Sequence, residues 1–278
     1  MELMEVDGLV IREAKFGEAD EMITLLTADR GKLSVSGKDV RRLNNRNAAT
    51  SQLFTYATFS LRKPKQCYYI NDSTYIENFM GIRFDVERLA LATYLCAIAD
   101  DLAMPDVADP ELMQMTLNAL YALSDRDDIP PERVKAAYEF RAICHAGFQP
   151  DLLLCAGCHA GKVEEPMYLD VMNGRLFCKE CQEAYVHSAD YAMDDTTAKI
   201  HIRISPSVRR AMYYIAVAPV KKLFSFRVTE AEDRTVLGIA CERYLLNHLE
   251  HSFPSLDFYK KVKDPIDIRP TKGRNESQ

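Results

Sequence analysis

Four cysteines in two pairs are the residues of this sequence best suited to chemistry. Cys155 and Cys158 form one pair, Cys178 and Cys181 form the other, and 19 residues separate the pairs. Two tight turns with this spacing are typical of a zinc ribbon or treble clef, in which four thiolates surround one ion. Gly157 is expected to give the first turn its backbone freedom. The spacing predicts one zinc ion on all four cysteines, with disulfides or free thiols as alternatives.

An open coordination position decides whether such an ion takes part in catalysis. Catalytic zinc usually has three protein ligands and one open position, whereas four thiolates close the shell. His145 and His159 are nearby in the sequence, but the four cysteines are the better-placed ligands. The sequence contains no GxGxxG, GxxxxGK[ST], HExxH or GxSxG motif, and neither cysteine pair follows a proline as in zinc deaminases. We therefore predict a structural zinc ion and a protein that is not an enzyme.

The first 80 residues have the pattern of a small β-domain. Short runs rich in β-branched and aromatic residues alternate with turn residues. About five such strands in this length suit a closed barrel of the OB type. The predicted strands lie in residues 6–11, 22–27, 33–37, 53–61 and 67–70.

The apolar period changes to that of helices after Asp85. Helices are predicted at 89–102, 112–123 and 134–146, and Ser205-Pro206 is expected to open another. A capping box at 229–232 precedes a long helix that extends to about Ser252. The predicted fold class is α+β multi-domain: an N-terminal OB-fold β-barrel (1–80), then an α-helical domain (81–259) with an embedded four-cysteine zinc motif at about 151–185. Residues 260–278 are polar, and we expect this tail to be disordered.

Composition and charge predict a cytoplasmic protein. The N-terminus carries acids where a signal peptide would carry lysines, and the longest uncharged apolar stretch, 211–220, is too short to span a bilayer. The net charge of −6 does not by itself indicate a nucleic-acid-binding protein. The four cysteines outside the pairs are scattered in apolar segments and are expected to be reduced core residues: Cys67, Cys96, Cys144 and Cys241.

Positive charge gathers in one stretch of this acidic chain. In the 36 residues from Arg30 to Lys65, nine residues are basic and Asp39 alone is acidic. A flexible basic loop at 37–46 would suit a phosphate backbone, because its cations can follow a strand without reading bases. A solvated barrel face is the alternative interpretation. The predicted DNA-binding residues are Arg30, Lys32, Lys38, Arg41, Arg42, Arg46, Arg62, Lys63 and Lys65.

Aromatic residues of the barrel are a second possible source of affinity for nucleic acid. Bases stack on aromatic side chains in single-strand-binding OB folds. Most of the five aromatics in this region are expected to be core residues instead: Phe54, Tyr56, Phe59, Tyr68 and Tyr69.

The order of several segments resembles the bacterial recombination mediator family RecO. Residues 8–12, 16–27 and 31–33 look like the opening barrel of that family, and 52–57 look like its next strand. Residues 138–141, followed by 146–152 and the first cysteine pair, are similar to the helix that enters its zinc module. Residues 244–256 resemble its terminal helix.

The resemblance implies a non-enzymatic role in DNA repair. It implies binding of single- and double-stranded DNA, annealing of complementary strands, and work with RecR to load RecA onto strands coated by single-strand binding protein. It also implies a contact in the helical domain with the acidic, apolar tail of single-strand binding protein. Arg141 is a candidate for that contact, with a structural salt bridge as the alternative.

Two other function classes fit parts of the sequence. An RNA- or ribosome-associated OB/zinc binding protein would also combine a basic barrel with a closed zinc site. A zinc-dependent hydrolase or deaminase would instead need one open position on the metal. We expect a cytoplasmic, nucleoid-associated protein with no membrane contact.

Overall fold

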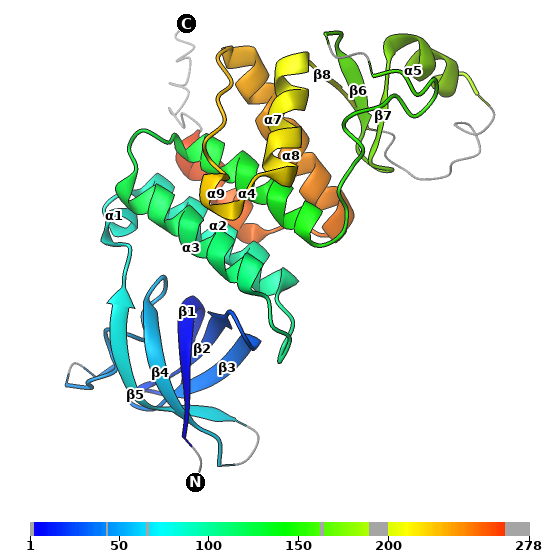
Figure 1. The fold of residues 1–278 in the computed structure, drawn as a ribbon. Helices are drawn as coiled ribbons and strands as arrows, with labels where there is room; N and C mark the ends of the chain where they lie inside the picture. Colours follow the sequence, from blue (N-terminus) through cyan, green and yellow to red (C-terminus); the bar gives the residue numbers. More distant parts are fainter. Residues whose placement is uncertain (1–2, 43, 65–66, 162–163, 189–199, 265–278) are drawn as a thin grey trace, which may run out of the picture.

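A computed structural model describes residues 3–42, 44–64, 67–161, 164–188 and 200–264. Figure 1 shows a β-barrel at the N-terminal end, a helical domain beside it, and a small module at the far side of the helices. The architecture agrees with the predicted α+β fold class, an OB-type barrel followed by helices that carry a cysteine cluster. None of the described helices is long and apolar enough to cross a membrane.

Five strands close the barrel in the order β1-β2-β3-β5-β4, and β4 pairs with β1. Every pairing is antiparallel except that of β3 with β5, as expected for an OB-type barrel. Buried and exposed residues alternate along β3 and β4, which is why the sequence pattern was informative. The strands are β1 (Leu3–Phe16), β2 (Asp20–Thr27), β3 (Gly31–Gly37), β4 (Tyr56–Arg62) and β5 (Tyr68–Glu77).

The helical domain is organised around α4. This helix is buried on nearly every side and packs against α2, α3, α7 and α8, while α9 packs on α2. Asp109 and Ser205 cap α3 and α7 through their side chains, in agreement with helix-start rules. The helices are α1 (Met80–Arg83), α2 (Val86–Leu102), α3 (Pro110–Asp125), α4 (Pro131–His145), α7 (Pro206–Val217), the 3-10 turn η1 (Val220–Lys222), α8 (Ala231–Leu249) and α9 (Pro254–Lys263).

The cysteine module is a three-stranded antiparallel sheet with one short helix. Its central strand β6 pairs on one side with β7 and on the other with β8, which arrives about 30 residues later in the chain. Gly174 is in the left-handed region at φ 62°, as the predicted hairpin turn requires. The elements are β6 (Met167–Asp170), β7 (Arg175–Phe177), α5 (Lys179–Val186) and β8 (His201–Ile204).

The structure corrects three of the expectations from sequence. The predicted capping box at 229–232 does not form, because Glu230 is the N-cap of α8 and its side chain makes no capping hydrogen bond. Residues 260–263 form the last turn of α9 rather than the start of the tail, and β8 extends the module beyond residue 185. The rest of the predicted disordered tail, 265–278, lies outside the described residues.

The barrel and the helical domain share one hydrophobic core. Leu9, Leu26 and Phe54 of the barrel belong to the same buried cluster as the inner faces of α2, α3 and α4. Backbone hydrogen bonds also cross this interface, which we call the seam. The N–H of Lys32 donates to the carbonyl of Met104, and the N–H of Asp109 donates to the carbonyl of Ala28. Asp100, at the end of α2, accepts contacts from Arg12 and Lys32. The seam is therefore a folded interface rather than a flexible linker.

Gly31 lies in this seam and provides a test of it. Its φ is +58°, and a Cβ there would lie 2.0 Å from the carbonyl oxygen of Met104. Gly17 has a similar φ of +65° but nothing within 4 Å of the corresponding position, so Gly17→Ala is a matched control. We expect Gly17→Ala to cost about 1 kcal/mol and Gly31→Ala more than about 3 kcal/mol in free energy of unfolding, measured by urea denaturation. Equal losses of free energy of unfolding in the two variants would show that the backbone at the seam shifts easily to make room for a side chain.

Candidate nucleic-acid interface and metal centre

The cysteine quartet comes together as its spacing predicted. The sulfur atoms of Cys155, Cys158, Cys178 and Cys181 all lie within 4.8 Å of one another, and Cys158 Sγ is 3.9 Å from Cys178 Sγ. Sulfurs that bind one zinc ion at about 2.3 Å in a tetrahedron are about 3.8 Å apart. The quartet therefore has the donors and the spacing to hold one metal ion.

Gly157 serves the quartet by its size rather than by an unusual backbone angle. Its φ is not positive, but a Cβ at this residue would lie 2.8 Å from the Cys181 sulfur. The residue of the turn in the left-handed region is His159, with φ 56°. His145 is engaged elsewhere, since its Nε2 is 2.9 Å from a carboxylate oxygen of Asp109. Neither histidine joins the described cysteine cluster.

The surroundings of Cys155 favour its thiolate, which is the form that binds a metal ion. Burial opposes ionisation of Cys155, but hydrogen bonds from the backbone at Cys158, Cys178 and Gly157 outweigh it and lower its pKa to about 6. Burial raises the pKa values of Cys178 and Cys181. A bound cation reverses this effect, because a coordinated thiol is deprotonated.

A tyrosine of the helical domain fixes the module in place. The Tyr244 hydroxyl on α8 donates to the carbonyl of Phe148, just before the first cysteine pair. The same hydroxyl would lie 2.6 Å from a Cβ at Gly174, so the hairpin turn packs directly on it. The module thus sits on α8, at the side of the helical domain away from the barrel (Figure 1).

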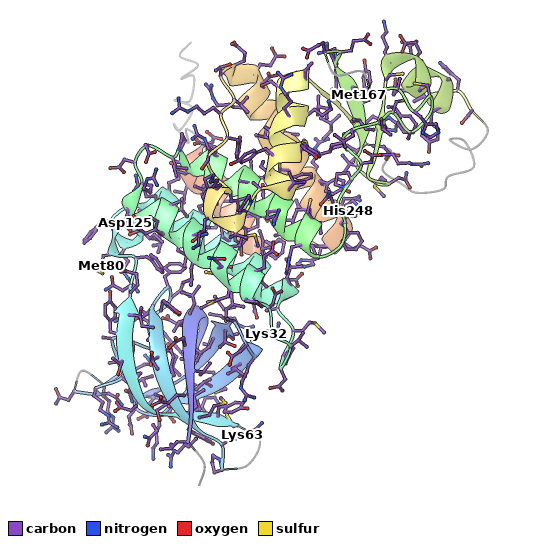
Figure 2. All side chains as sticks on the ribbon, viewed as in Figure 1. Lys32, Lys63, Met80, Asp125, Met167 and His248 are labelled. Carbon is purple, nitrogen blue, oxygen red and sulfur yellow. The ribbon has the colours of Figure 1, made fainter. Side chains whose placement is uncertain are left out.

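The basic residues divide between two ends of the barrel. Figure 2 shows Lys32 at the end that faces the helices and Lys63 at the opposite end. Lys32 is engaged in the seam, where its Nζ donates to the backbone carbonyl and the carboxylate of Asp100. Arg30 is exposed in the turn between β2 and β3 at the seam end. Lys65 lies outside the described residues.

The remaining basic residues lie after β3 and at the end of β4. Lys38, Arg41 and Arg42 follow β3 and are all exposed, and the backbone N–H of Arg41 donates to Ala19 in the β1–β2 turn. Arg62 and Lys63 end β4, beside the start of β5, which pairs with β3. The β2–β3 surface and the neighbouring turns form the usual oligonucleotide site of OB folds.

Exposed partners leave these cations available to a ligand. Arg42 pairs with Asp39 at 2.9 Å and Arg46 with Asp72 at 3.4 Å, but both arginine side chains remain about two-thirds or more exposed, at 71 % and 67 %. Surface ion pairs of this kind contribute little, about 0 to 1 kcal/mol. A phosphate can therefore displace them.

Hydrogen bonds connect the described part of the basic loop and the residues after it to the barrel. Asn47 is buried beneath it and accepts a hydrogen bond from Ser73 of β5, while Thr50 and Ser51 donate to the Asn47 carbonyl. Asn45 donates its side-chain amide to the Lys38 carbonyl. These short polar side chains were not recognised in the sequence as the residues that hold the loop.

Three aromatic side chains are accessible beside the basic residues. Tyr68 and Tyr69 are partly exposed at the start of β5, with the Lys63 ammonium 4.5 Å from the Tyr68 ring centre. Phe16 ends β1 and is 63 % exposed; it was not predicted from the sequence, because the expected first strand ended at residue 11. Phe54 and Phe59 are buried, as expected of most of these aromatics.

Arg141 has the partners of a structural residue. Its guanidinium lies 2.6 Å from Glu111 and also donates to the carbonyls of Ile215 and Ala216, and its side chain is 13 % exposed. This geometry favours the salt-bridge alternative over a contact with an acidic tail.

A groove between α4, α8 and α9 is better suited than Arg141 to bind an acidic, apolar peptide. Its volume is about 720 Å³, and apolar side chains that include Phe226, Val228 and Leu237 line it. Arg133, Arg234 and Arg243 also line it. Cations beside an apolar groove suit an acidic peptide with apolar side chains.

Comparison with known proteins identifies the family. Residues 1–79 match the family described as Recombination protein O N terminal, and residues 83–257 match Recombination protein O C terminal. The chain is 33 % identical over 262 residues to the DNA repair protein RecO of Acetivibrio thermocellus, covering 94 % of this chain and 98 % of that protein. It is 26 % identical over 263 residues to the protein of the same name from Caldicellulosiruptor saccharolyticus, covering 95 % and 100 %. With both domain families matched in order along a barrel and a helical domain, this chain belongs to the RecO family of DNA repair proteins.

Proposed function

We propose that this protein is a non-enzymatic recombination mediator that binds single- and double-stranded DNA on its barrel and anneals complementary strands. The observation that carries the proposal is the cluster of exposed basic residues beside accessible aromatics on an OB-type barrel. Cations bind the phosphates of any sequence, and aromatic rings accept unpaired bases. The proposed site residues are Lys38, Arg41, Arg42, Arg46, Arg62 and Lys63, with Arg30 and Lys65 as further candidates. Lys32 is left out, because Asp100 engages its ammonium group.

Annealing follows from the distribution of charge. Two DNA strands repel each other, and a concentrated patch of cations screens that repulsion and makes their encounter more frequent. The chain as a whole carries a net charge of −6, so the rest of its surface disfavours indiscriminate coating of duplex DNA. Both properties suit a protein that brings strands together and then releases them.

Membership of the family supports specific partners. We propose that the protein works with RecR to load RecA onto strands coated by single-strand binding protein, in the cytoplasm and associated with the nucleoid. The groove beside Arg133 fits the acidic, apolar tail of single-strand binding protein better than Arg141, whose guanidinium is occupied. The cysteine quartet would hold a structural zinc ion that stabilises the module.

An RNA- or ribosome-associated role is the alternative function. The basic barrel and the four-cysteine module would serve it as well. Competition between single-stranded DNA and structured RNA at about 0.15 M salt separates the two proposals. A strong preference for RNA would contradict the DNA-repair proposal.

Reversal of charge in the loop tests the DNA site. We expect Lys38→Glu with Arg41→Glu and Arg42→Glu to weaken binding to all DNA sequences about equally. The slope of log K against log salt should become shallower by about 0.7 for each phosphate of single-stranded DNA that the variant no longer neutralises. Arg210→Glu with Lys221→Glu and Lys222→Glu makes the same change in net charge on exposed residues of the helical domain. Equal losses of affinity in the two variants would indicate a general charge effect and no site on the barrel.

Phe16 tests the aromatic part of the interface. Its ring is largely exposed, so Phe16→Ala should leave the free energy of unfolding nearly unchanged. If the ring stacks on a base, the same change weakens single-stranded DNA binding by about 1 to 3 kcal/mol and duplex binding much less. Phe84→Ala, at a residue 82 % exposed in the helical domain, is the control. Unchanged affinity for both forms of DNA would remove Phe16 from the interface.

Substitution within the quartet tests the metal. Cys155→Ser should yield protein with substoichiometric zinc by atomic absorption and a free energy of unfolding lowered by roughly several kcal/mol. Cys67→Ser, outside the quartet, should retain the metal. DNA affinity should persist in the folded fraction of Cys155→Ser. A stable fold without DNA binding would show that the module itself contacts DNA.

A further inference from the structure

The groove between α4, α8 and α9 carries more positive charge than its own acids neutralise. Two of its acids have partners, since Glu242 pairs with Lys135 and Lys260, and Glu132 pairs with Lys263. Arg133, Arg234 and Arg243 have no ion pair within the described part of the chain, although all three line the groove.

Like charges are brought together at the rim of this groove. Burial and the neighbouring charges of Arg227 and Arg234 lower the pKa of Arg133, against the opposing effect of Asp128. Arg234 is held in position by hydrogen bonds to the carbonyls of Val228 and Thr229. Arginines arranged in this way form a site for a carboxylate, because a carboxylate would relieve their repulsion.

The chain itself continues from the edge of the groove with a matching sequence. Lys263 and Asp264, the last described residues, already line the groove. The residues that follow are Pro265, Ile266, Asp267 and Ile268, a carboxylate between two large apolar side chains. Four residues reach about 13 to 14 Å when extended, which is enough to follow a groove whose wall they leave.

We propose that residues 265–268 dock in this groove of the same molecule, with Ile266 and Ile268 on its apolar lining and the Asp267 carboxylate among the arginines. Phe226, Val228 and Leu237 supply apolar surface for the isoleucines, and Arg133 and Arg234 supply donors for the carboxylate. Because the segment is tethered to α9, its effective concentration at the groove is of millimolar order.

Docking of this segment within the same molecule, or cis docking, would regulate the access of other peptides to the groove. A peptide of the same chemistry, acidic and apolar, must displace residues 265–268 before it can bind. A weak partner would then be excluded, and a partner present in many copies would compete effectively. The inference goes beyond the proposed DNA-binding function and does not depend on which protein supplies the competing peptide.

The test uses the full chain and a labelled peptide of residues 264–272. Fluorescence anisotropy compares the natural chain with a chain carrying Ile266→Ser and Ile268→Ser. We expect the double variant to bind the peptide at least tenfold more tightly, because its own segment no longer competes. A chain that ends at Asp264, which keeps all of α9, should bind as the double variant does. Equal affinities for all three chains, or no binding by any, would overturn the proposal.

A charge exchange locates the contact within the groove. In the double-serine chain, Arg133→Glu should lower the affinity for the natural peptide at least tenfold. The same variant should bind a peptide that carries Asp267→Lys, because the exchanged charges again attract each other. Arg126→Glu makes the same change of charge outside the groove and should do neither. Loss of binding with both variants would indicate non-specific attraction and overturn the assignment. Analytical ultracentrifugation of the natural chain should show a monomer; a dimer that the two serine substitutions dissociate would place the segment in a second copy and overturn cis docking.

Discussion

The shared core between barrel and helices is the constraint on which the rest of the structure depends. An OB-type barrel buries its own interior, but one end remains open unless another element covers it. Here Leu9, Ile11, Leu26 and Phe54 extend the helical core into that end. Gly31 permits the close approach, because any side chain would strike the carbonyls of Met104 and Val107. The barrel is thereby held in one orientation relative to α2 and α3.

Closure of one end determines which part of the barrel surface stays exposed. Lys32 and Arg12 lie at the seam and pair with Asp100, so part of the basic excess serves the fold. The basic loop follows β3 and its cations stay exposed, and the start of β5 pairs with β3. The basic residues of 30–65 therefore divide into exposed cations and one, Lys32, that is engaged in the scaffold, a division that charge counting alone does not reveal.

The sequence was most informative where local pattern and tertiary role coincide. Alternation along β3 and β4 predicted the barrel, and the spacing of the four cysteines predicted their meeting. The sequence was less informative where contacts between residues far apart in the chain determine the local structure. The last turn of α9 looked like a polar tail, yet Lys260 pairs with Glu242 and Lys263 with Glu132 on other helices. Asn47 joins the end of the basic loop to Ser73 in a later strand, and the exposure of Phe16 depends on where β1 ends.

Buried lysine and glutamate side chains explain why three arginines of the groove can remain without an ion pair. Lys135 is almost fully buried and joins Glu139 at 2.7 Å and Glu242 at 2.8 Å, and Tyr94 donates to Glu139. Burial raises the pKa of Glu139, whereas Lys135 and Lys260 outweigh burial at Glu242 and lower its pKa. Among the groove acids, Glu242 is thus paired with Lys135 and Lys260, and Glu132 is paired with Lys263. These lysines already hold the acids, and none of the described groove carboxylates forms an ion pair with Arg133, Arg234 or Arg243. Asp264 is the groove residue from which the chain continues. A ligand carboxylate is what such a rim lacks, whether it comes from the following segment or from a partner.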